Sequence, residues 1–105
     1  MTQTTSKPTL EDLRARREEI LQIAAAHGAH NVRVFGSVAR GDADSRSDVD
    51  LLVDITSDAS GFLYFGLLED LRRALASALD REVDVVDSAG LNRLRERVLR
   101  EAVPL

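Results

Sequence analysis

The sequence predicts an α/β (α+β) domain in which a small mixed sheet of about three strands is flanked by helices. Three short segments are rich in β-branched residues and alternate between apolar and polar positions, as strands do. Around them lie longer segments whose apolar residues recur every three to four positions, as in amphipathic helices. The predicted order is helix, strand, short helical turn, strand, helix, strand, helix.

The chain begins with a polar segment, residues 1–8, that we expect to be a disordered tail. Thr9 is a suitable N-cap for a first helix, and Asp12 is its weak capping-box partner. Apolar residues then recur at helical spacing as far as Gly28, a residue type that commonly ends helices. We therefore expect one helix of about five turns here, and a single domain over residues 9–105.

Two strands and an intervening turn follow. Asn31–Phe35 is alternating and β-branched, and it ends abruptly at Gly36-Ser37. Val38–Gly41 is long enough for a single helical turn. Asp48–Ile55 alternates again, which places its aspartates on one face. Its other face carries three apolar residues: Val49, Leu51 and Val53.

The second half of the chain predicts a long helix over Phe62–Leu79, a third strand over Glu82–Asp87 and a final helix capped by Ser88. The long helix has an apolar stripe: Tyr64, Leu68, Leu71, Leu75 and Leu79. Aromatic residues at its start are expected to cap the core, or else to meet a partner: Phe62, Tyr64 and Phe65. The final helix has a stripe of its own: Leu91, Leu94, Val98 and Ala102. Its arginines share one face, which is either solvated or faces an acidic partner: Arg93, Arg97 and Arg100.

Composition excludes several classes of protein. The chain has 105 residues, enough for one small domain, and no cysteine, which excludes disulfide bonds and thiolate metal sites. Its formal net charge of -4 argues against direct binding of nucleic acid. No secretory signal opens the sequence, and the longest apolar stretch, Phe62–Leu68, is too short to cross a bilayer. We therefore expect a cytoplasmic protein with no membrane segment.

A Gly-Ser turn follows the first predicted strand. Glycine at position 36 permits a backbone conformation and a close approach that a side chain would block. A turn that leads into a helix directs backbone N–H groups towards one point, which suits a phosphate, and the Ser37 hydroxyl adds a donor. Arg40 is placed either to reach a phosphate oxygen or to brace the acidic loop that follows. Together with the residue before the first aspartate, these form the predicted nucleotide-binding set: Gly36, Ser37, Arg40 and Ser47.

Three aspartates form the candidate catalytic and metal-binding set: Asp48, Asp50 and Asp84. Asp48 and Asp50 lie two positions apart on a strand, so their side chains share a face with Cα atoms roughly 7 Å apart. Carboxylates this close repel each other, and two divalent cations remove that penalty. Asp84 alternates with valines and completes the site if its strand lies beside the second. Two such metal ions activate an attacking hydroxyl and stabilise a leaving pyrophosphate.

Each feature alone has a simpler interpretation, because a Gly-Ser pair is most often an ordinary turn and an Asp-x-Asp most often a solvated face. The combination of Gly36-Ser37, ten intervening residues, Asp48-Val49-Asp50 and a later Val-Asp-Val-Val strand is more specific. It resembles the signature of the DNA polymerase beta-like nucleotidyltransferase superfamily. The fuller pattern Phe-Gly-Ser-Val-Ala-Arg-Gly, then Ser-Asp-Val-Asp-Leu-Leu-Val, is similar to the minimal nucleotidyltransferases, or MNT proteins.

The resemblance covers nearly the whole chain and implies a nucleotidyltransferase fold, with residues 9–105 as a minimal nucleotidyltransferase domain. It implies that Gly36 and Ser37 hold the phosphates of ATP, the substrate. It further implies that Asp48 and Asp50 bind magnesium, with two Mg2+ ions as cofactors, and that the third carboxylate, Asp84, helps to deprotonate the acceptor hydroxyl.

The same resemblance implies a partner. Larger nucleotidyltransferases carry an extra domain that binds the acceptor, for which we expect this chain to have no room. MNT proteins are paired with a HEPN-domain toxin, so the resemblance implies an antitoxin in a hetero-oligomer with that toxin. As a Mg-dependent protein adenylyltransferase, it would transfer AMP from ATP to a tyrosine hydroxyl of the toxin.

Two other functions are compatible with the sequence. A binding-only antitoxin would inhibit its partner by occlusion and make little use of the nucleotide site. A nucleotidyltransferase acting on RNA or a small molecule would use the same aspartates on another acceptor. The intact set of carboxylates favours an active enzyme over the first, and the acidic balance argues against the second.

Overall fold

A computed structural model of the chain describes residues 7–56, 61–90 and 95–105. Most of the predicted tail, residues 1–6, lies outside these ranges, whereas Pro8, its last residue, is buried. Among the helices in the described ranges, none combines the length and apolarity that crossing a membrane requires.

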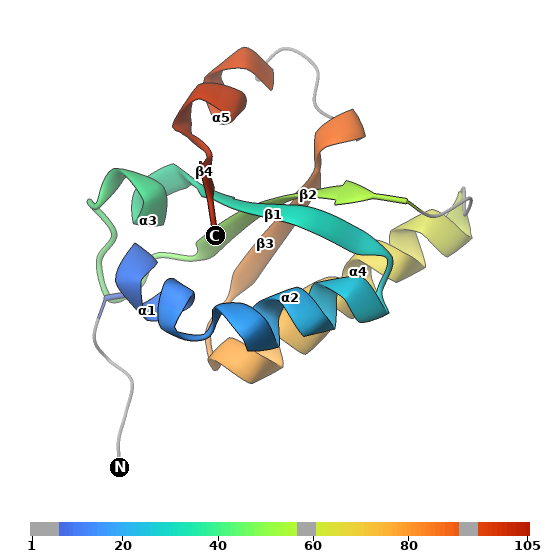
Figure 1. The fold of residues 1–105 in the computed structure, drawn as a ribbon, viewed down its shortest axis with the longest axis horizontal. Helices are drawn as coiled ribbons and strands as arrows, with labels where there is room; N and C mark the ends of the chain where they lie inside the picture. Colours follow the sequence, from blue (N-terminus) through green and yellow to red (C-terminus); the bar gives the residue numbers. More distant parts are fainter. Residues whose placement is uncertain (1–6, 57–60, 91–94) are drawn as a thin grey trace.

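A four-stranded mixed sheet forms the centre of the molecule (Figure 1). β1 (Ala29–Phe35) runs antiparallel to β2 (Val49–Ile55), and β3 (Val83–Asp87) lies parallel to β2 on its other side. β4 (Val103–Pro104) pairs antiparallel with the free edge of β1, which gives the strand order β3-β2-β1-β4. The predicted mixed sheet is confirmed, with one strand more than the three expected. The additional strand, β4, has only two residues, which are too few to show the alternation by which strands are predicted. Its proline is tolerated because β4 is an edge strand.

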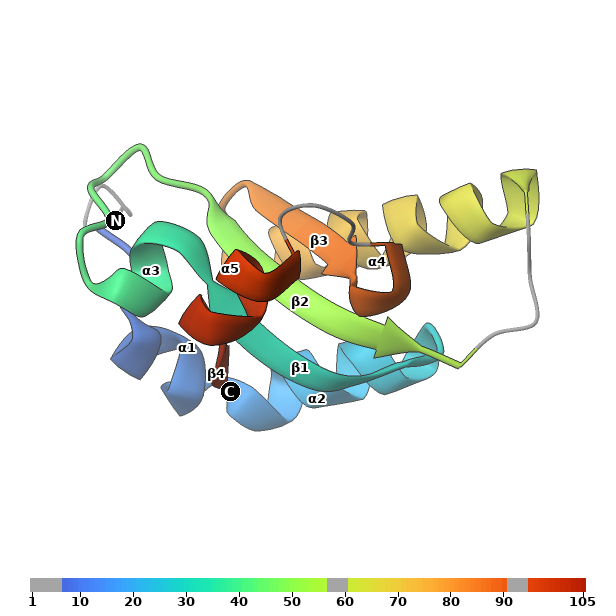
Figure 2. The same ribbon diagram turned by 90° about the horizontal axis from the view of Figure 1, so that it is seen from above.

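The helices lie on both sides of the sheet. α1 (Leu10–Ala15), α2 (Arg17–Ala26) and α4 (Phe62–Leu79) gather on one side (Figure 1). α5 (Arg95–Glu101) lies over the opposite face, with α3 (Gly36–Arg40) beside it at one end of the sheet (Figure 2). The end of the sheet near α3 is therefore where chain segments from both halves of the sequence meet.

The first helix was predicted as one continuous helix, and this is wrong, because the chain leaves helical geometry at Arg16 (φ −111°, ψ 21°). The N–H group of Arg16 donates to the carbonyl of Leu13 at 3.0 Å, which closes a tighter turn. The predicted cap is confirmed, since the Thr9 side chain accepts a hydrogen bond from the N–H of Asp12 at 3.0 Å. The residues around the break, Ala-Arg-Arg, all favour helices, so local propensity gives no sign of it.

The core lies between the sheet and the helices α2 and α4. The predicted apolar face of β2 and the middle of the predicted α4 stripe meet there. All of the following side chains are fully buried in this core: Ile20, Val49, Leu51, Val53, Leu71 and Leu75. The hydroxyl of Tyr64 donates to the carboxylate of Asp87, which ties α4 to β3.

We expect Leu71→Ala to destabilise the protein by about 2–5 kcal/mol, because it leaves a cavity in a fully buried site. Leu63→Ala on the same helix is the matched control, since Leu63 is 76% exposed and its loss should change the free energy of unfolding by less than about 0.5 kcal/mol. Urea denaturation of the two variants measures both values. Equal losses would show that α4 does not pack as described.

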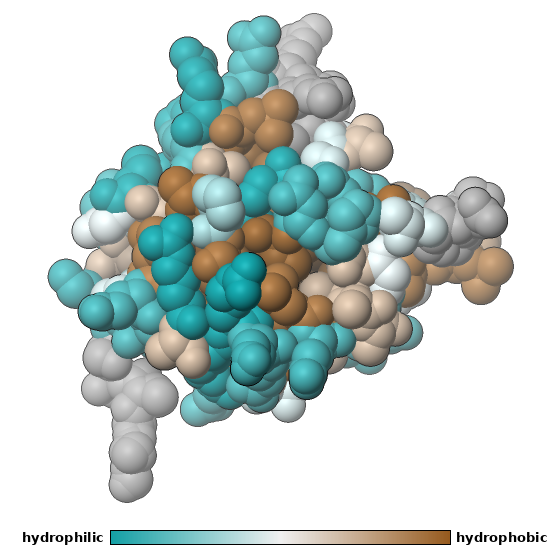
Figure 3. Space-filling model, in the orientation of Figure 1, coloured by the Kyte–Doolittle hydropathy of each residue, from teal (hydrophilic) through white to brown (hydrophobic). Residues whose placement is uncertain are grey.

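The start of α4 carries exposed apolar side chains. The bounds of this helix, Phe62–Leu79, agree with the prediction. Phe62, Leu63 and Phe65 are 96%, 76% and 68% exposed, so of the three aromatic residues there only Tyr64 turns inward. Figure 3 shows this end of α4 as an apolar, brown projection at the right edge of the molecule. The expectation that the cluster caps the core is therefore wrong for the two phenylalanines.

Ser88 was predicted to cap the final helix, but in the structure Ser88–Gly90 forms a 3-10 turn. In the described ranges the final helix is α5, Arg95–Glu101, which ends one residue before Ala102 of the predicted stripe. The Ser88 hydroxyl donates to the carboxylate of Asp54, on the neighbouring strand β2. Residues 91–94, which include Leu91, Arg93 and Leu94 of the predicted helix, lie outside the described ranges.

Candidate functional site

The Gly-Ser turn joins β1 directly to α3. Gly36 has a φ of 73°, a left-handed conformation that favours glycine. A Cβ atom at this position would overlap Oδ2 of Asp50 and lie 3.1 Å from its Cγ. Two features therefore require glycine at position 36: its backbone angle and the Asp50 carboxylate packed against it. Among the described residues, the Ser37 hydroxyl has no hydrogen-bond partner, so its donor is available to a ligand.

The sheet brings the predicted site residues to one end of three adjacent strands. Phe35, the last residue of β1, is the register partner of Asp50 on β2, and Asp50 is the register partner of Asp84 on β3. Asp48 lies just before β2, which starts one residue later than predicted, and is exposed. Because β2 runs parallel to β3 and antiparallel to β1, the end of β1 meets the beginnings of the other two strands.

Burial and the charges of the other two aspartates both affect the Asp50 carboxyl. The pKa of the half-buried Asp50 carboxyl is raised to about 6, mainly because burial disfavours the charged form. The negative charges of Asp84 and Asp48 raise it further, while Arg40 opposes the shift. At neutral pH the surroundings of Asp50 therefore disfavour its ionised form.

The donor set fits divalent cations by its chemistry. In the described ranges, no three acidic, histidine or cysteine side chains already converge as a group that could hold a metal ion. The oxygen-only donors and the raised pKa of Asp50 nevertheless suit a hard cation, because its positive charge favours the ionised carboxylates and removes their repulsion. Asp48, Asp50 and Asp84 are the residues that would hold such ions.

An open cavity of about 360 Å³ lies against the Gly-Ser turn, a volume within the range of small-molecule sites. The sheet and α3 form one side of it, and α5 forms the other. Its lining residues are Phe35, Gly36, Ser37, Arg40, Asp50, Arg97, Val98 and Glu101. The cavity therefore joins three of the four predicted nucleotide-binding residues to one of the three aspartates.

Comparison with known proteins identifies the family. The family model described as polymerase beta nucleotidyltransferase matches residues 18–105. The chain belongs to this family. A relative from Thermococcus cleftensis, named protein adenylyltransferase MntA, is 39% identical to this nucleotidyltransferase over 82% of this chain and 92% of its own. A solved structure provisionally described as a minimal nucleotidyltransferase is 50% identical, with a TM-score of 0.78 over 93% of this chain and 97% of the other.

The fold is shared with more distant solved structures as well. One is a complex of a tri-AMPylated HEPN toxin of Shewanella oneidensis with an MNT antitoxin, which matches with a TM-score of 0.63 at 21% identity, over 87% of this chain and 69% of the other. These findings confirm the predicted nucleotidyltransferase fold, the resemblance to MNT proteins and the assignment as an enzyme that acts on a nucleotide.

Two predicted nucleotide-binding residues of this nucleotidyltransferase are already engaged by protein groups. Arg40 Nε donates to Oδ2 of Asp42 at 3.2 Å, so it braces the acidic loop while also lining the cavity. The Ser47 hydroxyl accepts a hydrogen bond from the N–H of Asp44 at 2.9 Å and donates to its carboxylate. The pKa of Asp44 is lowered, chiefly by the N–H of Arg46 and then by this hydroxyl. Ser47 is not among the lining residues, so its position gives it a role in the loop.

The side of the site that α5 supplies was not predicted from the sequence. Arg97 was assigned to a solvated or partner-facing helix surface, and Glu101 and Val98 were given no role in the site. All three line the cavity. No sequence pattern links a helix near the end of the chain to a turn in its first half, so only the folded structure reveals this contact.

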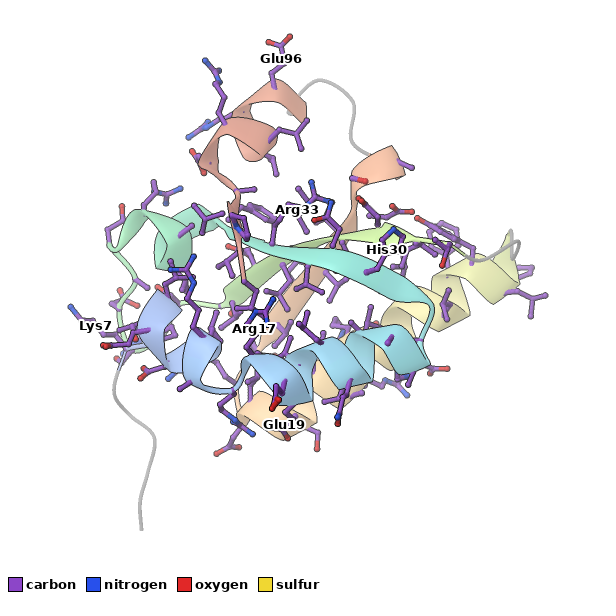
Figure 4. The ribbon with its side chains drawn as sticks, viewed as in Figure 1. Lys7, Arg17, Glu19, His30, Arg33 and Glu96 are labelled. Carbon is purple, nitrogen blue, oxygen red and sulfur yellow. The ribbon has the colours of Figure 1, made fainter. Side chains whose placement is uncertain are left out.

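A second polar cluster lies further along the same face of β2. The carboxylate of Asp54 accepts hydrogen bonds from Arg33 Nη2 at 2.6 Å and Asn31 Nδ2 at 2.9 Å, as well as from the Ser88 hydroxyl. These donors lower the pKa of Asp54, with Ser88 the largest contributor. Figure 4 shows Arg33 on the side of β1 that faces α5. In contrast to Asp50, Asp54 has a structural role, because three side-chain donors compensate its negative charge.

Proposed function

We propose that this nucleotidyltransferase is an antitoxin that transfers AMP from ATP to a tyrosine hydroxyl of a HEPN toxin. The observation that carries the proposal is the cavity in which Gly36, Ser37 and Asp50 meet, with Asp84 on the next strand. The name of the MntA relative supports protein adenylylation as the activity. The solved complex of an MNT antitoxin with an AMPylated HEPN toxin supports the choice of partner.

Three residues of the cavity make different contributions to nucleotide binding. Gly36 lets the backbone of the turn approach the phosphates, and Ser37 adds a hydroxyl donor. Arg40 supplies positive charge on the α3 side of the same cavity. Positioning and charge neutralisation of this kind provide most of the catalysis in phosphoryl-type transfers.

The reaction forms one bond and breaks one. The tyrosine oxygen attacks the α-phosphorus of ATP, the bond from that phosphorus to the oxygen bridging to the β-phosphate breaks, and pyrophosphate leaves. The hydroxyl proton passes to a carboxylate oxygen of Asp84, which is exposed and therefore accessible to the acceptor. Two Mg2+ ions held by Asp48, Asp50 and Asp84 would supply the charge that stabilises the leaving pyrophosphate.

The product explains how the toxin would be neutralised. The AMP group adds bulk and a negatively charged phosphodiester to the tyrosine. Because affinity for RNA depends largely on positive charge that meets the phosphate backbone, a negative group near the toxin's cleft weakens RNA binding. Several AMP groups in succession would strengthen this effect.

The proposal is tested by intact mass spectrometry of the HEPN toxin after incubation with this protein, ATP and magnesium. We expect mass to be added in steps of one AMP. Asp48→Asn is the control, because Asp48 is exposed and its replacement removes a carboxylate of the site without disturbing the core. The variant should still bind the toxin and add no mass.

Two results would contradict the proposal. A toxin that co-purifies with the wild-type protein and loses its toxicity without any added mass would instead indicate inhibition by occlusion. AMP transfer to RNA or to a small molecule, with the toxin unmodified, would assign a different acceptor to the same site.

A further inference from the structure

We propose that Arg40 and Arg97 form a paired cationic site for the β- and γ-phosphates of the nucleoside triphosphate, and that Glu101 positions both arginines before the nucleotide binds. This inference rests on the proposed function, since it concerns the substrate of the same cavity. It assigns a binding role to a helix, α5, that carries none of the residues of the Gly-Ser and aspartate motifs.

One carboxylate holds two arginines from different helices. Arg40 Nη1, from α3, lies 3.1 Å from Oε1 of Glu101, and Arg97 Nε, from α5, lies 3.5 Å from its Oε2. The Glu101 side chain is only 24% exposed, whereas those of Arg40 and Arg97 are 44% and 71% exposed. The Glu101 carboxylate is thus less exposed than the two guanidinium groups, which suits the binding of phosphate groups from the solvent side.

The three residues line the same cavity as the Gly-Ser turn. The arginines stand on its α3 and α5 walls, and Asp50 stands on the sheet side with Gly36 and Ser37. A triphosphate that reaches from the carboxylates across this cavity therefore passes between Arg40 and Arg97. The outer surface of α5 differs from the surface that lines the cavity, because it carries an acidic residue, Glu96, that points away from the sheet (Figure 4).

Stability alone gives little reason for this arrangement. Exposed ion pairs contribute little, and the Arg97–Glu101 pair has the less favourable order for a helix, with the cation before the anion. Its separation of 3.5 Å is also long for a strong charge-assisted hydrogen bond. Phosphate oxygens offer each guanidinium two parallel hydrogen bonds, so a bound triphosphate would draw both arginines away from Glu101.

Calorimetric titration of the isolated protein with ATP and with AMP, both in the presence of magnesium, tests this inference. We expect Arg97→Ala to weaken ATP binding by about 10-fold or more, as for the loss of a charged hydrogen bond, and to leave AMP binding unchanged. Arg97→Lys, which keeps the charge but loses the paired donors, should recover only part of the loss. Arg100→Ala is the matched control on the same helix, because Arg100 donates to the carbonyl of Glu96 and does not line the cavity.

Equal affinity of Arg97→Ala and Arg100→Ala for ATP would overturn the inference. An equal loss of ATP and AMP binding in Arg97→Ala would also overturn it, because the phosphates that distinguish the two ligands would then not be involved. ATP binding that depends on Arg97, in a protein that adds no AMP to the toxin, would support this inference while refuting the proposed function.

Discussion

Gly36→Ala is expected to abolish most of the transferase activity, by about 100-fold or more, because a methyl group at this position displaces the Asp50 carboxylate. The substitution also places a non-glycine residue at a φ of 73°, which costs about 1–3 kcal/mol of stability. Steady-state kinetics together with urea denaturation separate the two effects.

Gly41→Ala provides the matched control for this prediction. Gly41 also has a left-handed φ, 83°, but a Cβ atom there would meet nothing within 4 Å. We therefore expect Gly41→Ala to lose about 1–2 kcal/mol of stability from its backbone angle and to keep most of its activity. If Gly36→Ala retained as much activity as Gly41→Ala, then contact with Asp50 would not be the reason for the glycine.

Asp50→Asn is expected to reduce transfer by about 1000-fold while making the metal-free protein more stable at pH 7.5. The raised pKa of Asp50 means that the folded protein favours the protonated, neutral group, and asparagine is neutral at every pH. A change from 3.8 to about 6 corresponds to about 3 kcal/mol. Because the side chain is only half-buried, solvent screening reduces the expected gain to about 1–2 kcal/mol.

The gain in stability should depend on pH in one direction. Between the unfolded pKa of about 3.8 and the folded pKa of about 6, the folded protein binds more protons at Asp50 than the unfolded chain does. The wild type therefore loses stability as the pH rises through this window, relative to Asp50→Asn. The difference in unfolding free energy between the two proteins in EDTA should be near zero at pH 4 and largest above pH 6. A difference that grew towards low pH would contradict this account of Asp50.

Asp54→Asn is the control on the same face of the same strand. Its carboxylate accepts three side-chain hydrogen bonds that lower its pKa, so the charged form stabilises the fold. We expect this variant to lose about 1–3 kcal/mol at pH 7.5, the opposite sign to Asp50→Asn. The two aspartates, four positions apart on one strand, thus differ because Asp54 accepts hydrogen bonds from three donors, whereas Asp50 is half-buried with two other carboxylates nearby.

Local sequence patterns predicted the parts of the fold that depend on local physics. The bounds of α4 and the alternation of β2 agree with the structure because each is set by periodic apolar residues that meet one core. The break at Arg16 and the strand Val103–Pro104 could not be predicted, since neither changes the local pattern. Pairing with β1 is what makes a strand of Val103 and Pro104.

The candidate site was predictable to a similar extent. Antiparallel pairing of β1 with β2 brings Gly36 to Asp50, and parallel pairing of β2 with β3 brings Asp84 beside Asp50. The sequence showed that Asp48 and Asp50 share a face, but the place of Asp84 depended on a strand pairing that the sequence left open. The roles of Arg97 and Glu101 depend on how α5 packs across the sheet, which no spacing reveals. Ser47 is the opposite case, since it lies next to the Asp-x-Asp motif in the sequence but does not line the cavity. Its hydroxyl accepts a hydrogen bond from the N–H of Asp44 in a local turn instead.

The order in which the strands pair has a consequence for newly made protein. β1 and β2 are antiparallel neighbours in sequence, whereas β3 joins β2 only after the chain has crossed over through α4. Pairing between segments that are distant in sequence forms slowly, because the entropy cost of closing the intervening loop must be overcome first. A chain still emerging from the ribosome therefore forms its Gly-Ser turn before Asp84 joins Asp50. On the proposed roles of these residues, transfer begins only once the crossover has closed.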